Sequence, residues 1–233
     1  MGRVILSGAS KGMTVPVSYP KNFADATWAQ IIEACQQNRV PNSWVVGSQK
    51  AMTINGTSYP IDIIGKNHDT YTAGGTAPLT FQLHDCYADT KQMNSTNTNS
   101  SGWTSCAMRQ THLPSILALM PTEVQNGIRE VNKLTSIGHQ GSIINTTADK
   151  LFLLSEIEIF GSVNYSKSGE GTQYDYYKTG NGTAKKRDGS GSRWWERSPV
   201  STDNVSFCIV YDGGGIGFSA PYNAYGVAFA FCF

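Results

Sequence analysis

Residues 193–233 constrain the fold more than any other stretch of the chain. They open with the pair Trp194-Trp195 and the corner Arg197-Ser198-Pro199, and they close on the apolar run 227–233. Both ends are apolar enough to be buried. The middle, residues 200–225, mixes glycine, aspartate, asparagine and tyrosine without a repeating apolar period. Because rigid frames commonly carry irregular binding loops, this segment predicts a binding site.

The amino-acid composition restricts both the fold class and the kinds of partner that the protein can have. Charged residues make up only 15% of the chain and the net charge is +1, so no strong field attracts nucleic acid or an acidic membrane. No apolar run is long enough to span a bilayer. The 24 glycines and abundant Ser, Thr and Asn favour turns and short strands. We therefore expect a soluble, loop-rich α+β domain, with no nucleic-acid partner and no membrane insertion.

Residues 1–21 lack periodicity and are predicted to be a leader or linker, and residues 22–233 are predicted to form one domain. An amphipathic helix should follow the capping candidates Asp25 and Thr27. Its apolar residues recur at helical spacing: Trp28, Ile31, Ile32 and Cys35.

Strands are predicted at 44–46, 51–54, 57–64 and 79–83. The dipeptide Asn55-Gly56 indicates a hairpin turn between the second and third of these. Pro60 cannot donate a backbone hydrogen bond, which predicts an edge position for the third strand.

The middle of the chain alternates loops and short helices. The polar stretch NSTNTNSSG at 94–102 predicts a surface loop. Helices are predicted near 105–113 and from Thr122, where Gln125 has capping-box spacing and Val124, Ile128 and Val131 share a face.

The run LFLLSEIEIFG at 151–161 predicts a strand that leads into a helix capped by Ser155 and Glu158 and ended by Gly161. Residues 164–193 show no apolar face and predict a long surface excursion.

Other constellations favour structural interpretations. Glu156 and Glu158 suit the first turn of a helix better than a catalytic pair. The set His84, Cys86, Cys106 and His112 matches no common zinc spacing. The five cysteines are an odd number without a CxxC pair, so buried free thiols are expected and no metal or other cofactor is predicted.

Two further motifs also favour structural interpretations. Asp212-Gly213-Gly214-Gly215 favours a tight turn over a phosphate-binding loop, because no Lys-Ser/Thr pair follows. The basic residues Lys185, Lys186, Arg187 and Arg193 before the tryptophans favour a solvated loop over a nucleic-acid patch.

Two separated segments resemble a known fold. LFLLSEIEIF at 151–160, together with WWERSP and the closing GVAFAF, resembles the formylglycine-generating-enzyme branch of the C-type lectin fold. The order of SWVVGSQKAM, Asn67-His68-Asp69, FQLHDC, MNSTNTNSSGW, LFLLSEIEIFG, WWERSP and GVAFAFC is similar to a bacterial and phage family. That family includes variable proteins diversified by retroelements, and the resemblance covers about residues 40–233.

The resemblance implies a C-type-lectin-like α+β domain with short antiparallel strands, a few helices and long loops, whose variable segment is 194–233. It implies a constant framework of Trp194, Trp195, Glu196, Arg197, Ser198, Pro199, Phe207, Cys208, Gly226, Val227, Phe229 and Phe231. It implies solvent-facing, ligand-binding positions at Val200, Asp203, Val205, Tyr211, Asp212, Gly214, Ile216, Phe218, Tyr222 and Tyr225.

Within this framework, we expect Arg197 to tie the strand corner to a carboxylate or carbonyl group, with Glu196 either as its partner or pointing outward. Tyr211, Phe218, Tyr222 and Tyr225 would be aromatic anchors, and glycines 213–215 would allow close approach of a ligand.

The resemblance thus implies a non-enzymatic protein that binds a host or cell-surface receptor, itself a protein, from a phage tail tip or fibre or a bacterial surface. A trimer or attachment to a larger fibre would supply avidity. Two alternatives stay open: a metal-dependent oxidase or sulfoxide-forming enzyme of the same branch, and a structural virion or adhesin component. Cys208 and Cys232 are too far apart in sequence to match the cysteine pair of the enzymes, and no Glu-Pro-Asn motif for calcium is present.

Overall fold

The computed structural model describes residues 18–233, so most of the predicted leader, residues 1–17, lies outside the described residues. The helical elements are η1 (Phe23–Asp25, a 3₁₀ turn), α1 (Trp28–Gln36), α2 (Gly102–Ser105), η2 (Met108–His112, a π-helical turn), α3 (Leu113–Leu117), α4 (Thr122–Gly127), α5 (Glu156–Phe160) and α6 (Asp175–Lys178). The strands are β1 (Gln49–Ile54), β2 (Thr57–Lys66), β3 (Leu79–Leu83), β4 (Val131–Ser136), β5 (Ile144–Asp149), β6 (Leu151–Phe152), β7 (Lys185–Arg187), β8 (Ser190–Ser192), β9 (Trp194–Pro199), β10 (Phe207–Val210), β11 (Ile216–Ser219) and β12 (Ala230–Cys232).

Short strands in antiparallel pairs and few helices confirm the predicted α+β class. One continuous cluster of buried apolar residues extends from Phe23 to Phe233. Within residues 18–233, no helix is both long and apolar enough to cross a membrane.

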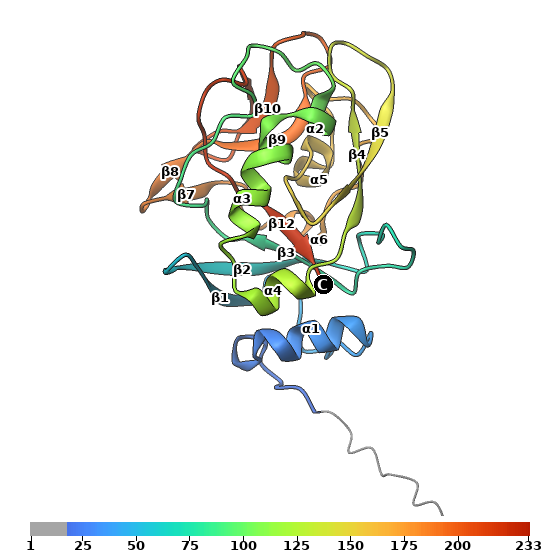
Figure 1. The fold of residues 1–233 in the computed structure, drawn as a ribbon, viewed down its shortest axis with the longest axis vertical. Coiled ribbons are helices and arrows are strands. Elements are labelled where there is room, and N and C mark those ends of the chain that lie inside the picture. Colours follow the sequence, from blue (N-terminus) through green and yellow to red (C-terminus); the bar gives the residue numbers. More distant parts are fainter. Residues whose placement is uncertain (1–17) are drawn as a thin grey trace, which may run out of the picture.

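The main sheet has the strand order β1-β2-β3-β12-β6, and all its neighbouring pairs are antiparallel. The last strand, β12, lies inside this sheet, where Phe231 pairs with Phe81 of β3 on one side and with Leu151 of β6 on the other (Figure 1). The predicted burial of residues 227–233 is confirmed, since all seven are completely buried.

The predicted hairpin is confirmed in β1 and β2. Its turn residues Asn55 and Gly56 have φ angles of 47° and 80°. A type I′ turn needs positive φ at both central residues, and Asn-Gly adopts these angles at low cost.

The edge position predicted from Pro60 is wrong, because β2 lies between β1 and β3. The ladder between β2 and β3 ends at the Ile61–Leu83 pair, so Pro60 stands just beyond it. The carbonyl of Pro60 still accepts a hydrogen bond from the backbone N–H of His84 (2.9 Å). An internal strand tolerates proline here because the ladder needs no N–H at this position.

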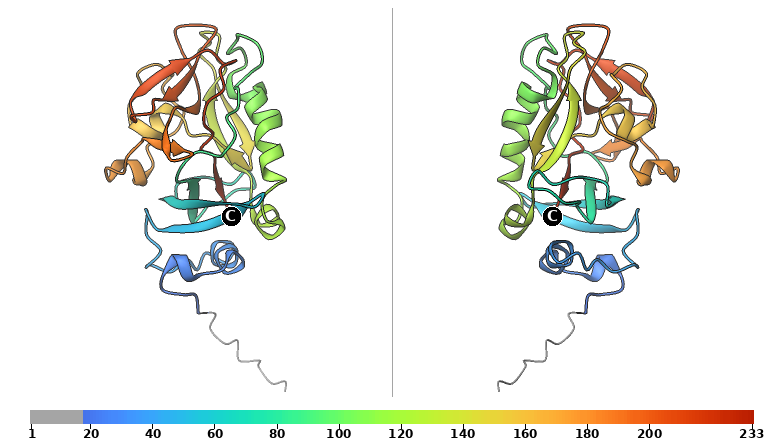
Figure 2. Two further views of the ribbon diagram at one scale, coloured as in Figure 1. Left: turned by 90° about the vertical axis from the view of Figure 1, so that its left-hand side faces the viewer. Right: turned by 90° about the vertical axis from the view of Figure 1, so that its right-hand side faces the viewer.

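Helix α1 is confirmed, with Thr27 rather than Asp25 as its N-cap. Thr27 Oγ1 accepts from the N–H of Gln30 (3.1 Å), and the Gln30 side chain accepts from the N–H of Thr27 (2.9 Å). The ring of Trp28 lies 6.0 Å from that of Phe233, so α1 packs on the main sheet (Figures 1 and 2).

The strand predicted at 44–46 is wrong. Trp44 instead sits in a turn, where its backbone N–H donates to Pro41 and its indole N–H donates to Pro20 (3.0 Å). The side chain is completely buried against Phe23. Trp44 is therefore apolar because it packs a loop against the core, and it does not take part in strand pairing.

The helical region near 105–113 is found as the succession α2, η2 and α3. The capping box predicted for Thr122 is wrong because Pro121 occupies the N-cap of α4 and the Gln125 side chain donates to the carbonyl of Met120 (2.7 Å). Val131 belongs to β4 and not to that helix.

The strand-to-helix passage at 151–161 is confirmed, although β6 is only two residues long. Ser155 and Glu158 form the reciprocal capping box of α5, and Gly161 ends the helix at φ 72°.

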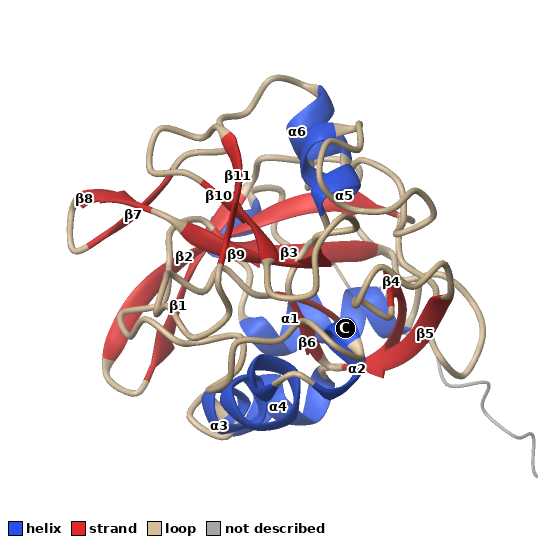
Figure 3. Cartoon of the chain, turned by 90° about the horizontal axis from the view of Figure 1, so that it is seen from above, coloured by secondary structure: helices blue, strands red, loops and turns tan. Residues whose placement is uncertain are grey.

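A second sheet of order β11-β10-β9 lies at the end of the molecule opposite α1 (Figure 1), and Figure 3 views the molecule from the end that carries this sheet. The surface excursion predicted for 164–193 is wrong in part. It contributes α6, the β7–β8 hairpin and the buried side chains Glu170, Tyr174, Tyr176, Tyr177 and Lys185.

Candidate functional site

Arg197 fixes strand β9, the base of the second sheet, to other parts of the chain. Its Nε donates to Thr135 Oγ1 in β4 (2.9 Å), its Nη1 to the Leu153 carbonyl (2.9 Å) and its Nη2 to Glu158 Oε1 in α5 (3.0 Å). The side chain is completely buried. These contacts tie the strand corner to a carboxylate and to a carbonyl group.

Lys133 extends this contact into a buried ionic network that the sequence did not reveal. Its Nζ donates to Glu158 (2.7 Å), to Asp69 (2.8 Å) and to the Tyr174 hydroxyl (3.1 Å). Burial alone would raise the pKa of Glu158, but the charges of Arg197 and Lys133 outweigh it and lower that pKa. These bonds connect β4, α5 and β9 through oppositely charged side chains, so each buried charge of the network has a partner.

The other framework residues are also buried. The indole N–H of Trp195 donates to the Lys91 carbonyl (2.8 Å), and that of Trp194 donates to the Thr183 carbonyl (3.1 Å). A Cβ on Gly226 would lie 2.5 Å from Cys86 Sγ, so only glycine fits there. Pro199, at the end of β9, is buried as well.

Glu196 differs from both expectations stated for it. It does not pair with Arg197, whose guanidinium is bonded to Glu158, and it does not point outward, because it is completely buried. Within residues 18–233, neither carboxyl oxygen of Glu196 has a hydrogen-bond partner.

The register of the second sheet divides the predicted ligand positions between its two faces. Ile209 pairs with Trp195 and Gly217, which places these residues on one face, and Cys208 pairs with Phe218 on the other. β11 is an edge strand, so side chains near it can be reached from both faces.

On the first face, Arg193 stands between two tyrosines. Its guanidinium carbon lies 5.1 Å from the centroid of the Tyr211 ring and 5.9 Å from that of the Tyr225 ring. Tyr225 is held in turn by Trp195, at a ring distance of 5.1 Å, and by a hydrogen bond from Ser219 Oγ (3.1 Å). The exposed Arg193 is thus set on an ordered aromatic base.

On the opposite face, Phe218 packs edge-on against Tyr165 at a ring distance of 4.8 Å. Phe218 is nevertheless exposed, and Ile216 beside it is half-buried. This face is more apolar than the one that carries Arg193.

Exposed aromatic side chains are confined to this region. Within residues 18–233, the only exposed Phe, Tyr or Trp side chains are Tyr211 (37%), Phe218 (46%) and Tyr222 (47%). All three were predicted as anchors, and the fourth, Tyr225, is half-buried.

Three predicted positions do not suit an exposed, freely varied residue. Val200 is buried (2% exposed). Asp203 Oδ1 accepts from the backbone N–H groups of Val205 (2.9 Å) and Ser206 (2.8 Å), so this side chain shapes its own turn. Gly214 has φ 85°, and a Cβ there would lie 2.6 Å from Thr183 Oγ1.

The remaining positions are accessible: Val205 and Asp212 are exposed. The Asp212–Gly215 stretch is a tight turn, as predicted, closed by the N–H of Tyr211 donating to the carbonyl of Gly215 (2.7 Å).

The polar loop at 94–102 supports the loop at 200–206. Asn99 is completely buried, and its Nδ2 donates to the carbonyls of Asp203 (3.1 Å) and Ser206 (2.9 Å). Its Oδ1 accepts from the backbone N–H of His139 (2.7 Å). The expected surface loop thus contains a buried residue that joins three loops, which its low-complexity composition does not indicate.

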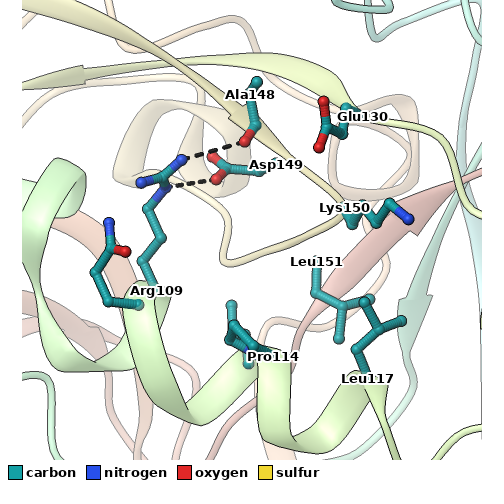
Figure 4. A pocket seen from close by; sticks show the side chains of 10 residues that line it. Arg109, Pro114, Leu117, Glu130, Ala148, Asp149, Lys150 and Leu151 are labelled. Atoms are coloured by element: carbon teal, nitrogen blue, oxygen red, sulfur yellow. Dashed lines mark hydrogen bonds and ion pairs between the residues drawn. The ribbon is translucent and has the colours of Figure 1, made fainter.

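A pocket of about 230 Å³ lies between η2–α3 and residues 148–151, and no residue of the second sheet lines it (Figure 4). Its apolar wall includes Leu113, Pro114 and Leu117, and an ion pair between Arg109 Nε and Asp149 Oδ1 (2.5 Å) closes the opposite side. Its charged lining residues are Arg109, Glu130, Asp149 and Lys150, and no Ser, Cys or His is among the residues that line it.

The residues considered for catalysis or metal binding are engaged structurally. Glu156 accepts hydrogen bonds from the N–H groups of Asn164 (3.0 Å) and Ser166 (2.9 Å). The five cysteines are free and buried, and burial raises the pKa of Cys106 to about 12. Among residues 18–233, no group of three or more His, Cys, Asp or Glu side chains could hold a metal ion, the set around His84 and Cys86 included.

The basic-aromatic patch considered for nucleic acid is not formed as such. Lys185 is buried, and its Nζ donates to the carbonyls of Leu83 (2.7 Å) and His84 (2.7 Å). Burial lowers the pKa of Lys185 to about 8.

Comparison with known proteins gives one match. A family model described as a domain of unknown function, DUF6273, matches residues 79–233, which is more than half of the chain. No curated protein and no solved structure matches the chain.

Proposed function

Since this chain belongs to the DUF6273 family, whose function is unknown, we propose from its own geometry that it is a non-enzymatic binding module. Its binding surface surrounds the edge strand β11. Arg193, Tyr211 and Tyr225 contribute from one face of the second sheet, Phe218 from the other face and Tyr222 from the loop after β11. The ligand is a protein receptor on a host or bacterial cell.

The observation that carries this proposal is where the exposed aromatic side chains gather. Tyr211, Phe218 and Tyr222 are exposed, whereas every other Phe, Tyr and Trp within residues 18–233 is at least half-buried. Tyrosine and arginine are the residue types most often found as anchors in protein interfaces, because they give a large contact area at a low entropic cost.

The sheet supports the proposal through its rigidity. Arg197 connects β9 to β4 and to Glu158, which Lys133 also contacts. Trp195 and Ser219 contact Tyr225. A face whose side chains are already ordered loses less conformational entropy when it binds.

We further propose that the fold is C-type-lectin-like and that a retroelement diversifies this face. Supporting this, several accessible positions lie at the edge strand and its turn, on a buried framework. On this proposal the protein is displayed on a phage tail tip or fibre or on a bacterial surface, and a trimer or fibre multiplies weak single sites.

Cell labelling tests the binding role. Fluorescently labelled protein is titrated onto intact bacterial cells from the source environment, with and without prior protease treatment of the cells. The variant Y211A/Y222A should bind with a Kd about 30-fold higher than wild type, since loss of anchor residues costs about 2 kcal/mol. Protease treatment should abolish labelling.

The matched control is V45A/L119A, which truncates two exposed apolar side chains that lie outside the second sheet. It should bind like wild type. Equal binding by Y211A/Y222A and wild type, or no labelling of any cells, would contradict the proposal and favour a structural virion or adhesin role.

A further inference from the structure

Glu196 occupies an unusual position for a carboxyl group. It lies in β9, an outer strand of the second sheet, yet none of its surface is exposed. Within the described chain, both of its carboxyl oxygens are buried and neither has a hydrogen-bond partner. An ionised carboxylate in such a place loses its hydration and gains nothing in return.

Neighbouring buried glutamates show how the fold supplies hydrogen-bond donors to a buried carboxyl group. Glu156 accepts from the N–H and Oγ of Ser166 (2.9 and 2.7 Å). Glu170 accepts from the N–H of Ser136 (2.8 Å) and from Ser198 Oγ. Glu158 pairs with Arg197 and Lys133. Glu196 alone of these four has no donor.

The groups that face Glu196 do not compensate a negative charge. They are Glu156 from α5, Glu170 from the following loop, Tyr177 from α6 and Cys208 from β10. The one nearby cation, Arg197 on the same strand, is bonded to Glu158 instead. Burial, followed by the repulsion from Glu156 and Glu170, raises the pKa of Glu196 well above its usual value.

We propose that Glu196 is protonated in the folded protein and acts as a proton-dependent switch: loss of its proton loosens β9 from β10 and so disorders the second sheet. This follows from the burial of both oxygens without a donor and from the acidic neighbours. It does not depend on the proposed binding function.

The direction of the pH effect follows from proton counting. The unfolded chain releases the Glu196 proton near pH 4.3, whereas the folded chain keeps it to a higher pH. Between those two values the folded state binds one proton more, so stability is fully present at acid pH and falls as pH rises. The unfolding equilibrium constant therefore gains about tenfold per pH unit from this group.

The test compares wild type with E196Q, which keeps the shape of a protonated glutamate. Denaturant unfolding is measured from about pH 5 upward. The ratio of the wild-type to the E196Q unfolding constant should rise by about tenfold per pH unit until the folded pKa is reached. The matched control is E156Q, at an equally buried glutamate with satisfied oxygens. Its ratio to wild type should stay constant from about pH 5 up to the pH at which Glu196 itself begins to lose its proton.

Infrared spectroscopy supplies a direct signature that holds even if E196Q does not fold. Wild-type protein at neutral pH should show the C=O stretching band of a protonated carboxyl group, and the band should disappear when the pH is raised. The band should be weaker in E196Q by the intensity of one carboxyl group and should keep its wild-type intensity in E156Q. Wild-type protein without this band, or a ratio of unfolding constants for E196Q that is flat with pH, would overturn the proposal.

Discussion

Glu158 shows how one side chain can determine several contacts. It forms the capping box of α5 with Ser155, and it also pairs with Arg197 of β9 and Lys133 of β4. The capping role could be predicted because it depends on a partner three residues away. The ionic role could not, since its partners are 25 and 39 residues distant.

The Arg197 site should not accept lysine. The variant R197K keeps the charge but loses the planar fork that reaches Thr135, Leu153 and Glu158 together. We expect it to lower the free energy of unfolding by about 3–5 kcal/mol, because buried polar partners lose their donors.

Chemical denaturation measures this loss, and R193K is the matched control. Arg193 lies four residues earlier and is exposed, so the same substitution there should change stability by less than about 0.5 kcal/mol. Similar small losses for both variants would refute the structural role of Arg197.

At the scale of elements, the turn between β10 and β11 shows which part of a loop can vary. Gly213 and Gly214 are adjacent, yet a Cβ on Gly213 would meet nothing within 4 Å, whereas a Cβ on Gly214 would meet Thr183 and the backbone of Ala184. The positive φ of Gly214 adds strain to any side chain there.

This difference gives a paired prediction. G214A should lower the free energy of unfolding by about 1–3 kcal/mol, whereas G213A should leave it within about 0.5 kcal/mol. Thermal unfolding of the two variants side by side measures both. Equal tolerance at the two positions would mean that the contact with Thr183 does not restrain the turn.

Elements with local signals could be predicted from the sequence. Helix α1, helix α5 and the β1–β2 hairpin depend on caps and turns whose residues are at most a few positions apart. The region 164–193 could not be predicted. Its burial depends on Tyr174 contacting Lys133 and Asp69, and no apolar period records that contact.

At the scale of the whole molecule, segments from the beginning and the end of the described chain pack into one core. β12 completes the main sheet beside β3, and β9–β11 form a second sheet just before it in the chain. The family match begins at residue 79, yet α1, β1 and β2 belong to the same core as the matched part. The α+β class and the exposure of Tyr211, Phe218 and Tyr222 could be predicted from the sequence, whereas the burial of Val200 and the crowding at Gly214 depend on contacts in the packed fold.

The central claim is that the edge of the second sheet is a binding face on a fixed framework. The measurement that tests it most directly is sequencing of the DNA for residues 193–233 in many copies from the source population. The account predicts substitutions at Tyr211, Asp212, Phe218 and Tyr222, at adenines of a near-identical template nearby, with Trp194, Trp195, Arg197 and Gly214 constant. An invariant segment, or substitutions spread equally over the buried framework, would contradict it.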